Sequence, residues 1–159
     1  MKEKKYYLTP VGLQKYKKEY ERLKQLRKEG KIKMRESRDD LWRPEDLNPD
    51  YEALRGELNF IERKLKELEY IFRNIKLIKK PTHSPEKVIL GSTVIVETGG
   101  NKDELTLIGT LEANPSEGKI SIESPVGRAL LSRKAGDEVT IESPVKITYK
   151  ILKIKFYQL

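Results

Sequence analysis

The chain has 159 residues, 36% of them hydrophobic and 36% charged, with no cysteine and one histidine. The missing cysteines exclude disulfides and Cys-based zinc sites, and a single histidine, His83, argues against a His-based metal site or a Ser-His-Asp triad. No apolar run approaches the roughly 20 residues that span a bilayer, and the Lys-rich start leads into no signal-peptide core. We therefore expect a soluble, cytoplasmic protein without a membrane partner.

The net charge of +8 belongs to the N-terminal half of the chain. Residues 1–80 hold 23 Lys and Arg against 15 Asp and Glu, whereas residues 81–159 hold 10 of each. A basic segment of this kind predicts a polyanionic partner or an acidic protein channel. Because the apolar supply is thin for one large globule, a long solvent-exposed element should account for part of the length.

The first predicted element is a long helix that begins near residues 8–12. Thr9 is suited to cap free backbone N–H groups, and Pro10 is tolerated at the first helical position. Apolar side chains then recur at spacings of three and four, at Leu13, Tyr16, Tyr20 and Leu23. This pattern weakens at Arg27 and Gly30.

The second predicted helix carries the clearest periodic pattern in the sequence. Its apolar residues alternate at spacings of three and four, at Tyr51, Leu54, Leu58, Ile61, Leu65, Leu68, Phe72 and Ile75. Such a heptad seam must be buried against a partner, and the first helix supplies one after a turn bracketed by Pro44 and Pro49. The sequence therefore predicts an antiparallel helical coiled-coil hairpin over residues 1–80, with an intermolecular coiled coil as the alternative.

The turn of this hairpin reverses the charge of its helices. Only Arg43 opposes a run of acidic residues in this stretch, which are Asp39, Asp40, Glu45, Asp46, Asp50 and Glu52. A solvated acidic turn is the simplest interpretation. Concentrated like charge also costs self-repulsion, so an acidic tip near residues 39–50 would suit metal binding or entry into a cationic site.

The remaining chain predicts a linker over residues 81–87 and a small β domain over residues 88–159. Short β-rich runs alternate with turn residues, and residues 127–131 predict one short helix. The predicted strands cover residues 88–90, 93–96, 105–108, 119–122, 138–141 and 148–154. The expected fold class is α+β, with a small antiparallel β-sheet and one helix after the hairpin. This part of the sequence contains no phosphate loop, nucleophile elbow or paired catalytic constellation.

Four motifs resemble those of the bacterial Gre-type transcription elongation factors, the GreA/GreB family. Residues 8–13 resemble the family's helix opening, and residues 48–53 resemble the end of its tip motif. Residues 91–94 are similar to the first strand of its C-terminal domain, and Ser124–Leu131 is similar to its most specific signature. The motifs follow the family's order over nearly the whole chain. The resemblance implies a coiled-coil hairpin and an FKBP-like C-terminal domain without prolyl isomerase activity.

The resemblance also implies a function. In this family the C-terminal domain docks beside the secondary channel of RNA polymerase, and the hairpin reaches the active centre and the nascent RNA 3′ end of a backtracked complex. Tip carboxylates help to hold a Mg²⁺ ion shared with the polymerase and orient the water that cleaves the RNA. The expected protein is a monomer without a cofactor of its own, and it is not an enzyme but stimulates the polymerase's RNA cleavage. Ser124–Leu131 is a candidate for docking.

The tip of this chain departs from the family's pattern, Gly-Asp-Leu-Ser-Glu-Asn-Ala-Glu-Tyr. An ungapped count places Pro44 and Leu47 at the positions of the family's Asp and Glu. The carboxylates of Glu45 and Asp46 lie between those two positions, and we expect them to be the catalytic and metal-binding pair. Asp40 takes that role if a four-residue insertion aligns it with the family's Asp, whereas a two-residue deletion aligns Asp46 instead.

Two alternatives remain open beside stimulation of cleavage. A Gre-like paralogue would occupy the same channel and inhibit or regulate the polymerase, and the displaced carboxylates sustain this hypothesis. A nucleic-acid-binding hairpin would explain the positive charge but not the acidic tip. Its phosphate contacts would be Lys15, Lys17, Lys18, Lys24, Lys28, Lys31 and Lys33.

Overall fold

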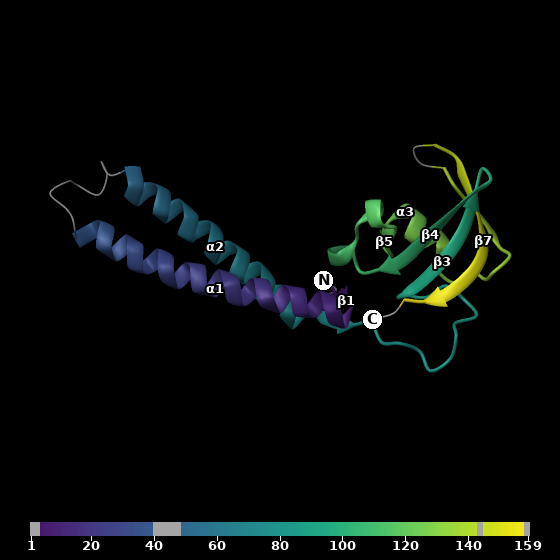
Figure 1. Cartoon of the computed structure of the whole chain (residues 1–159), viewed down its shortest axis with the longest axis horizontal. Coiled ribbons are helices and arrows are strands. Elements are labelled where there is room, and N and C mark those ends of the chain that lie inside the picture. The colour runs from purple at the N-terminus through teal and green to yellow at the C-terminus, as the bar shows by residue number, and fades with distance from the viewer. Residues whose placement is uncertain (1–3, 40–48, 143–144, 158–159) are drawn as a thin grey trace. The chain divides into compact units, whose positions relative to one another are not determined.

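The computed structural model describes residues 4–39, 49–142 and 145–157. The chain forms two compact units, and Figure 1 labels many of their helices and strands. One unit is Gln14–Asn74, and the other joins Met1–Leu13 to Ile75–Leu159. The hairpin predicted over residues 1–80 therefore includes two short segments that pack with the β unit in the structure.

Helix α1 runs from Pro10 to Asp39. The Thr9 hydroxyl accepts a hydrogen bond from the backbone N–H of Gly12 at 2.9 Å, which satisfies one of the free donors of the first turn. Pro10 occupies the first helical position, where its missing N–H costs nothing. The helix start predicted from the sequence is confirmed.

Helix α2 runs from Pro49 to Arg73 and supplies the apolar seam of the hairpin. Its buried side chains are Leu58, Ile61, Leu65, Leu68 and Ile71. The sequence pattern predicted the first four and missed Ile71. The residue after the helix, Asn74, caps its C-terminal end, because the side-chain amide of Asn74 donates a hydrogen bond to the carbonyl of Tyr70 at 2.9 Å. No helix in the described part of the chain is long and apolar enough to cross a membrane.

The weak point predicted in the α1 seam is a close packing site. A Cβ atom at Gly30 would lie 2.8 Å from Cδ2 of Leu58, so the absence of a side chain makes room for that leucine. Leu58 is thereby buried to 7% exposure. The apolar pattern is interrupted at Gly30 because the side chain of Leu58 packs where a larger residue would place its own side chain. A close-packed interior leaves no space there for an added methyl group.

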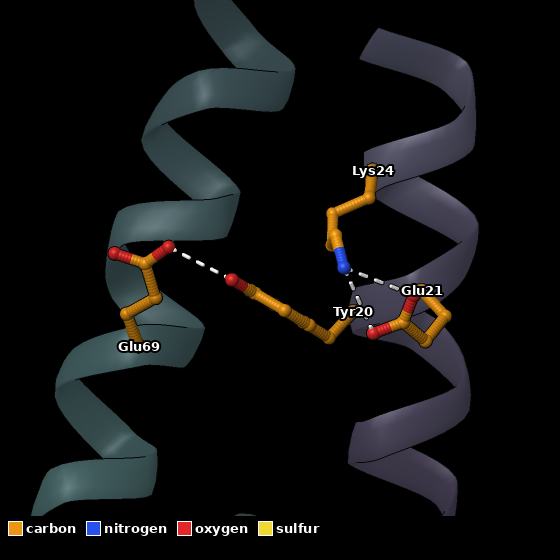
Figure 2. A network of polar contacts seen from close by, with 4 residues as sticks. All are labelled: Tyr20, Glu21, Lys24 and Glu69. Carbon is orange, nitrogen blue, oxygen red and sulfur yellow. Dashed lines mark hydrogen bonds and ion pairs between the residues drawn. The ribbon is translucent and has the colours of Figure 1, made fainter. Parts of the chain in front are cut away.

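Tyr20 ties the two helices together through both its hydroxyl and its ring. The hydroxyl donates a hydrogen bond to Oε1 of Glu69 at 2.9 Å, as Figure 2 shows. The ring meets Phe72 edge-on with centroids 5.5 Å apart. Nζ of Lys24 lies 5.5 Å from the ring centroid and pairs with Glu21 at 3.2 Å. This cluster joins apolar, cationic and hydrogen-bonding contacts on one side chain.

Two three-residue strands precede and follow the hairpin in the sequence. Strand β1 (Tyr6–Leu8) pairs in parallel with strand β2 (Ile75–Leu77), and the side chain of Leu8 is fully buried. Ile75, counted as the last residue of the helical seam, therefore lies in a strand. Sequence analysis missed this pair because three residues are too few to establish a period-two pattern.

The β unit is built on a five-stranded sheet in the order β5-β4-β3-β7-β6. Its strands are β3 (Ser92–Thr98), β4 (Asn101–Ile108), β5 (Lys119–Ser121), β6 (Glu138–Ile141) and β7 (Ile147–Phe156). Short 3-10 helices η2 (Thr110–Glu112) and η3 (Pro115–Glu117) join β4 to β5, and helix α3 (Pro125–Leu130) follows β5. The α+β class is confirmed, but the sheet is not wholly antiparallel as predicted, because β5 pairs parallel to β4.

The predicted strand over residues 88–90 is wrong. Val88 is fully buried in the core of the sheet, but its backbone joins the loop after α3 instead of a ladder. Its N–H donates to the carbonyl of Arg133 at 2.8 Å, and its carbonyl accepts from the N–H of Ser132 at 2.8 Å. Local β propensity marked a segment with one buried residue, Val88, without identifying its partner.

Truncation of the α2 seam should destabilise the hairpin. Leu65 is 2% exposed, so Leu65→Ala should lower the free energy of unfolding by about 2 to 4 kcal/mol through lost burial and a residual cavity. Chemical denaturation of the full chain followed by far-ultraviolet circular dichroism measures this. Phe60→Ala is the control, because Phe60 is 51% exposed and its loss should change little. Equal midpoints for both variants would contradict the assigned seam.

The Tyr20–Glu69 bond should make the hairpin sensitive to alkaline pH. The bond to Glu69 raises the pKa of Tyr20 above its ordinary value of 10.0, with burial as a second cause. Because the pKa of Tyr20 is higher in the folded state than in the unfolded state, its bond to Glu69 stabilises the fold below pH 10. That contribution is lost as the pH rises through the folded-state pKa of Tyr20.

We therefore expect the stability difference between the parent and Tyr20→Phe to shrink as the pH rises from about 10 through the raised pKa of Tyr20 in the folded state. Denaturation midpoints measured across that range test this. The matched control repeats the substitution in a Glu69→Gln background, where most of the alkaline dependence should be gone. A difference that stays constant with pH in the Glu69 background would count against the bond.

Candidate functional site

The three predicted site residues, Asp46, Glu45 and Asp40, lie outside the described residues. The structure does establish which helices precede and follow them in the sequence. Helix α1 ends at Asp39 and helix α2 begins at Pro49, so residues 40–48 connect two helices that are packed against each other. The tip segment is therefore joined to the chain by helix ends on both sides.

Two of the acidic residues predicted near the tip belong to the first turn of α2. Asp50 and Glu52 lie where the positive end of the helix dipole favours negative charge. Glu52 also pairs with Arg55, with Oε1 and Nη1 3.3 Å apart. These carboxylates thus serve the helix start. Within residues 4–39, 49–142 and 145–157, no group of three or more His, Cys, Asp and Glu residues could hold a metal ion.

The lysines of the nucleic-acid hypothesis are all exposed on α1, but only some of them gather. Lys24, Lys28 and Lys31 border an open groove of about 500 Å³, together with Glu21, Gln25 and Arg27. Lys31 pairs with Glu62 of the other helix at 3.5 Å, and Lys24 pairs with Glu21. The groove is basic, yet two of its three lysines are each already paired with a different carboxylate.

The Ser124–Leu131 motif has a clear structural role. The Ser124 hydroxyl caps α3, because it accepts from the N–H of Gly127 at 3.0 Å and donates to the carbonyl of Ser121 at 2.7 Å. A Cβ atom at Gly127 would overlap the Ser121 carbonyl, so this position requires glycine. Leu130 is fully buried in the sheet core. The motif therefore attaches α3 to the end of β5.

Besides Pro125, which is exposed at the start of α3, two further side chains of the same motif are exposed. Arg128 lies on the solvent side of α3, and Leu131, which follows the helix, is 38% exposed. Neither is needed for the cap or the core. They are the motif positions that a partner could contact, and a docking role for them stays a prediction.

Sequence reasoning missed Glu112, which contacts the start of α1. Its carboxylate accepts hydrogen bonds from the backbone N–H and the hydroxyl of Thr9, both at 2.6 Å. The two residues are 103 positions apart, and no periodic pattern links them. The available signal was Gly12, a glycine inside a helix where alanine is favoured, because a side chain there would overlap the Glu112 carboxylate.

Comparison with known proteins gives matches along both parts of the chain. Residues 6–77 match the family described as transcription elongation factor, N-terminal, and residues 82–156 match transcription elongation factor, GreA/GreB, C-term. Transcription elongation factor GreA of Geobacillus kaustophilus is 35% identical over 159 residues, covering 96% of this chain and 98% of its own length. GreA of Thermomicrobium roseum is 44% identical over 98 residues, covering 61% of this chain and 63% of its own length.

Solved structures match over similar lengths. GreA factor homolog 1 of Thermus thermophilus is 25% identical, covering 95% of this chain and 99% of its own, with a TM-score of 0.44. A GreA/GreB elongation factor of Nitrosomonas europaea is 21% identical, covering 96% and 99%, with a TM-score of 0.42. The family matches to residues 6–77 and 82–156 take in most of the sequence. The chain belongs to the GreA/GreB family of transcription elongation factors.

Proposed function

We propose that this protein binds RNA polymerase, inserts its hairpin into the secondary channel and stimulates cleavage of backtracked RNA, which rescues stalled complexes. The observation that carries this proposal is a packed pair of helices whose ends, Asp39 and Pro49, flank the acidic segment 40–48. Family membership supports the polymerase as the partner. The protein acts as a monomer in this proposal, and the cleaving enzyme is the polymerase.

The hairpin suits this role because its helices are held along their length. Leu65 and Leu68 are buried in the seam, and Tyr20 bonds across to Glu69. Lys31 adds an ion pair to the opposite helix. A carboxylate delivered from outside can assist a reaction only if its position is well defined, since small misplacements cost large factors in rate.

The tip carboxylates supply the chemistry in this proposal. Asp46 and Glu45, or Asp40 in the insertion alignment, carry the oxygen ligands that Mg²⁺ prefers. A Mg²⁺ ion shared with the polymerase supplies Lewis-acid chemistry for phosphodiester hydrolysis. The tip carboxylates would complete its ligand set and orient the attacking water. Since one or two carboxylates form no complete metal site, the protein alone should not cleave RNA.

Inhibition of the polymerase is the second candidate function. The same hairpin and the same β unit would serve a factor that occupies the channel without assisting cleavage. The observation that favours it is the tip sequence, where Pro44 and Leu47 stand at the positions of the family's Asp and Glu. A nucleic-acid-binding hairpin is less well supported, because Lys24 and Lys31 of the basic groove are already paired with carboxylates.

Neutralising the tip should separate chemistry from binding. Asp46→Asn and Glu45→Gln should abolish shortening of backtracked RNA while polymerase affinity stays within a few-fold, because each removes a ligand charge at nearly constant shape. Asp40→Asn should have the smaller effect under the ungapped alignment and the larger effect under the insertion alignment.

Both activities of the parent should be measured on one stalled complex across Mg²⁺ concentrations. Cleavage stimulation predicts shortened RNA, whereas inhibition predicts no shortening and slower nucleotide addition as factor is added. A parent that fails to stimulate cleavage at every Mg²⁺ concentration would overturn the leading proposal.

Substitution of Arg128 on α3 or of Leu131 just after it should weaken docking without unfolding the β unit. Arg128→Glu and Leu131→Ser should each raise the polymerase dissociation constant roughly tenfold, about 1.4 kcal/mol, because both side chains are exposed while the cap and Leu130 stay intact. Lys153→Glu, an exposed change on β7, is the matched control. Equal affinities for all three variants in a competition assay would rule out α3 as the docking element.

A further inference from the structure

The side chain of Thr9 caps the start of α1 and also binds Glu112. We call this contact between Thr9 and Glu112 the latch. The Thr9 hydroxyl accepts from the N–H of Gly12 at 2.9 Å and donates to the Glu112 carboxylate at 2.6 Å. The same carboxylate also accepts from the Thr9 backbone N–H at 2.6 Å. Thr9 is 3% exposed and Glu112 is half-buried, so the two bonds between them are partly sheltered from water. Charge-assisted hydrogen bonds of this length are among the strong ones in proteins.

Gly12 leaves space for the Glu112 carboxylate to lie against the start of α1. A Cβ atom at position 12 would overlap both oxygens and the carboxyl carbon of Glu112, so any other residue would displace the carboxylate. Glycine weakens a helix relative to alanine. Its presence in the first turn of α1 is therefore explained by the carboxylate that lies against it, which also faces the favourable positive end of the helix dipole.

The element that carries Glu112 is itself fixed to the sheet. The Thr110 hydroxyl bonds to the hydroxyl of Ser121 at 2.9 Å and to Oε2 of Glu123 at 2.8 Å, which ties η2 to the end of β5. A Cβ atom at Gly109 would overlap the carbonyl of Tyr7, so η2 also lies directly against β1. Glu112 therefore reaches Thr9 from a support held by several contacts.

We propose that Glu112 is a positioning residue of this factor. By holding the first turn of α1 on the unit that docks to the polymerase, it would restrict the path along which the rest of the helix carries the tip. This inference rests on the proposed function. It assigns to Glu112, Thr9 and Gly12 a role in delivering the tip carboxylates, and none in ligating the metal or in contacting the polymerase.

The latch predicts a loss of rate without a loss of binding. Glu112→Ala should lower the maximal rate of RNA cleavage at saturating factor by about tenfold or more, since misplacement of a catalytic group is costly. The half-saturating factor concentration should stay within about threefold of the parent, because Arg128 and Leu131, the side chains proposed for docking, are unchanged. Glu112→Gln keeps one carbonyl acceptor and should recover part of the rate.

Gly12→Ala should break the same contact by displacing the Glu112 carboxylate. It should slow cleavage as Glu112→Ala does, and adding it to Glu112→Ala should cause no further loss, because the displaced group is already absent. Gly56→Ala is the matched control, since Gly56 lies in α2 with nothing within 4 Å of the position of a Cβ atom. Additive losses from Gly12→Ala and Glu112→Ala would contradict a shared mechanism.

A readout without polymerase keeps the test independent of the proposed function. Because the chain has no cysteine, spin labels placed by Lys66→Cys on α2 and Lys150→Cys on β7 report one distance distribution. We expect a broader distribution in Glu112→Ala than in the parent and in Gly56→Ala. Equal widths together with parental cleavage rates would overturn the latch. If the parent fails to shorten RNA, the proposed function fails and the widths alone decide the latch.

Discussion

The burial of the α2 seam against α1 is the interaction on which the hairpin depends. A chain with 36% charged residues can keep a long helical pair only if its few apolar side chains share one stripe. Leu58, Leu65 and Leu68 form that stripe, and Gly30 gives Leu58 the space to enter it. Because the seam is narrow, most other positions on both helices are left for charge. Concentrating the apolar contacts thus leaves room for the basic surface of α1.

Periodic features of the fold could be predicted from the sequence, whereas those that depend on distant partners could not. The seam of α2 repeats every seven residues and was assigned correctly from Leu58 to Leu68. The strands β1 and β2 escaped because each has three residues and finds its partner across the whole hairpin. Glu112 escaped for the same reason, since its contact with Thr9 closes a loop of 103 residues. Local patterns identify elements, and long-range contacts decide how those elements are joined.

The candidate site divides along the same line. The acidic composition of the tip is visible in the sequence, but which of Asp46, Glu45 and Asp40 would serve a metal in the proposed mechanism depends on backbone geometry that no periodicity records. The Ser124–Leu131 motif was recognisable as a unit, and only the structure separates its capping and buried members from Arg128 and Leu131. A motif identifies a functional region, while burial and hydrogen bonds show which side chains remain available to a partner.

A factor that completes the active centre of another protein faces an unusual constraint. A metal site normally gains its precision from ligands that fix one another through a shared ion and a surrounding shell of hydrogen bonds. Carboxylates that serve a borrowed ion lack that mutual restraint, so their precision has to come from the chain behind them. Tyr20 and the leucine seam restrain the helices relative to each other, and the contact between Thr9 and Glu112 restrains the point where α1 starts. In the proposed mechanism these two contacts would therefore supply that precision, because they form within the protein before the polymerase is bound.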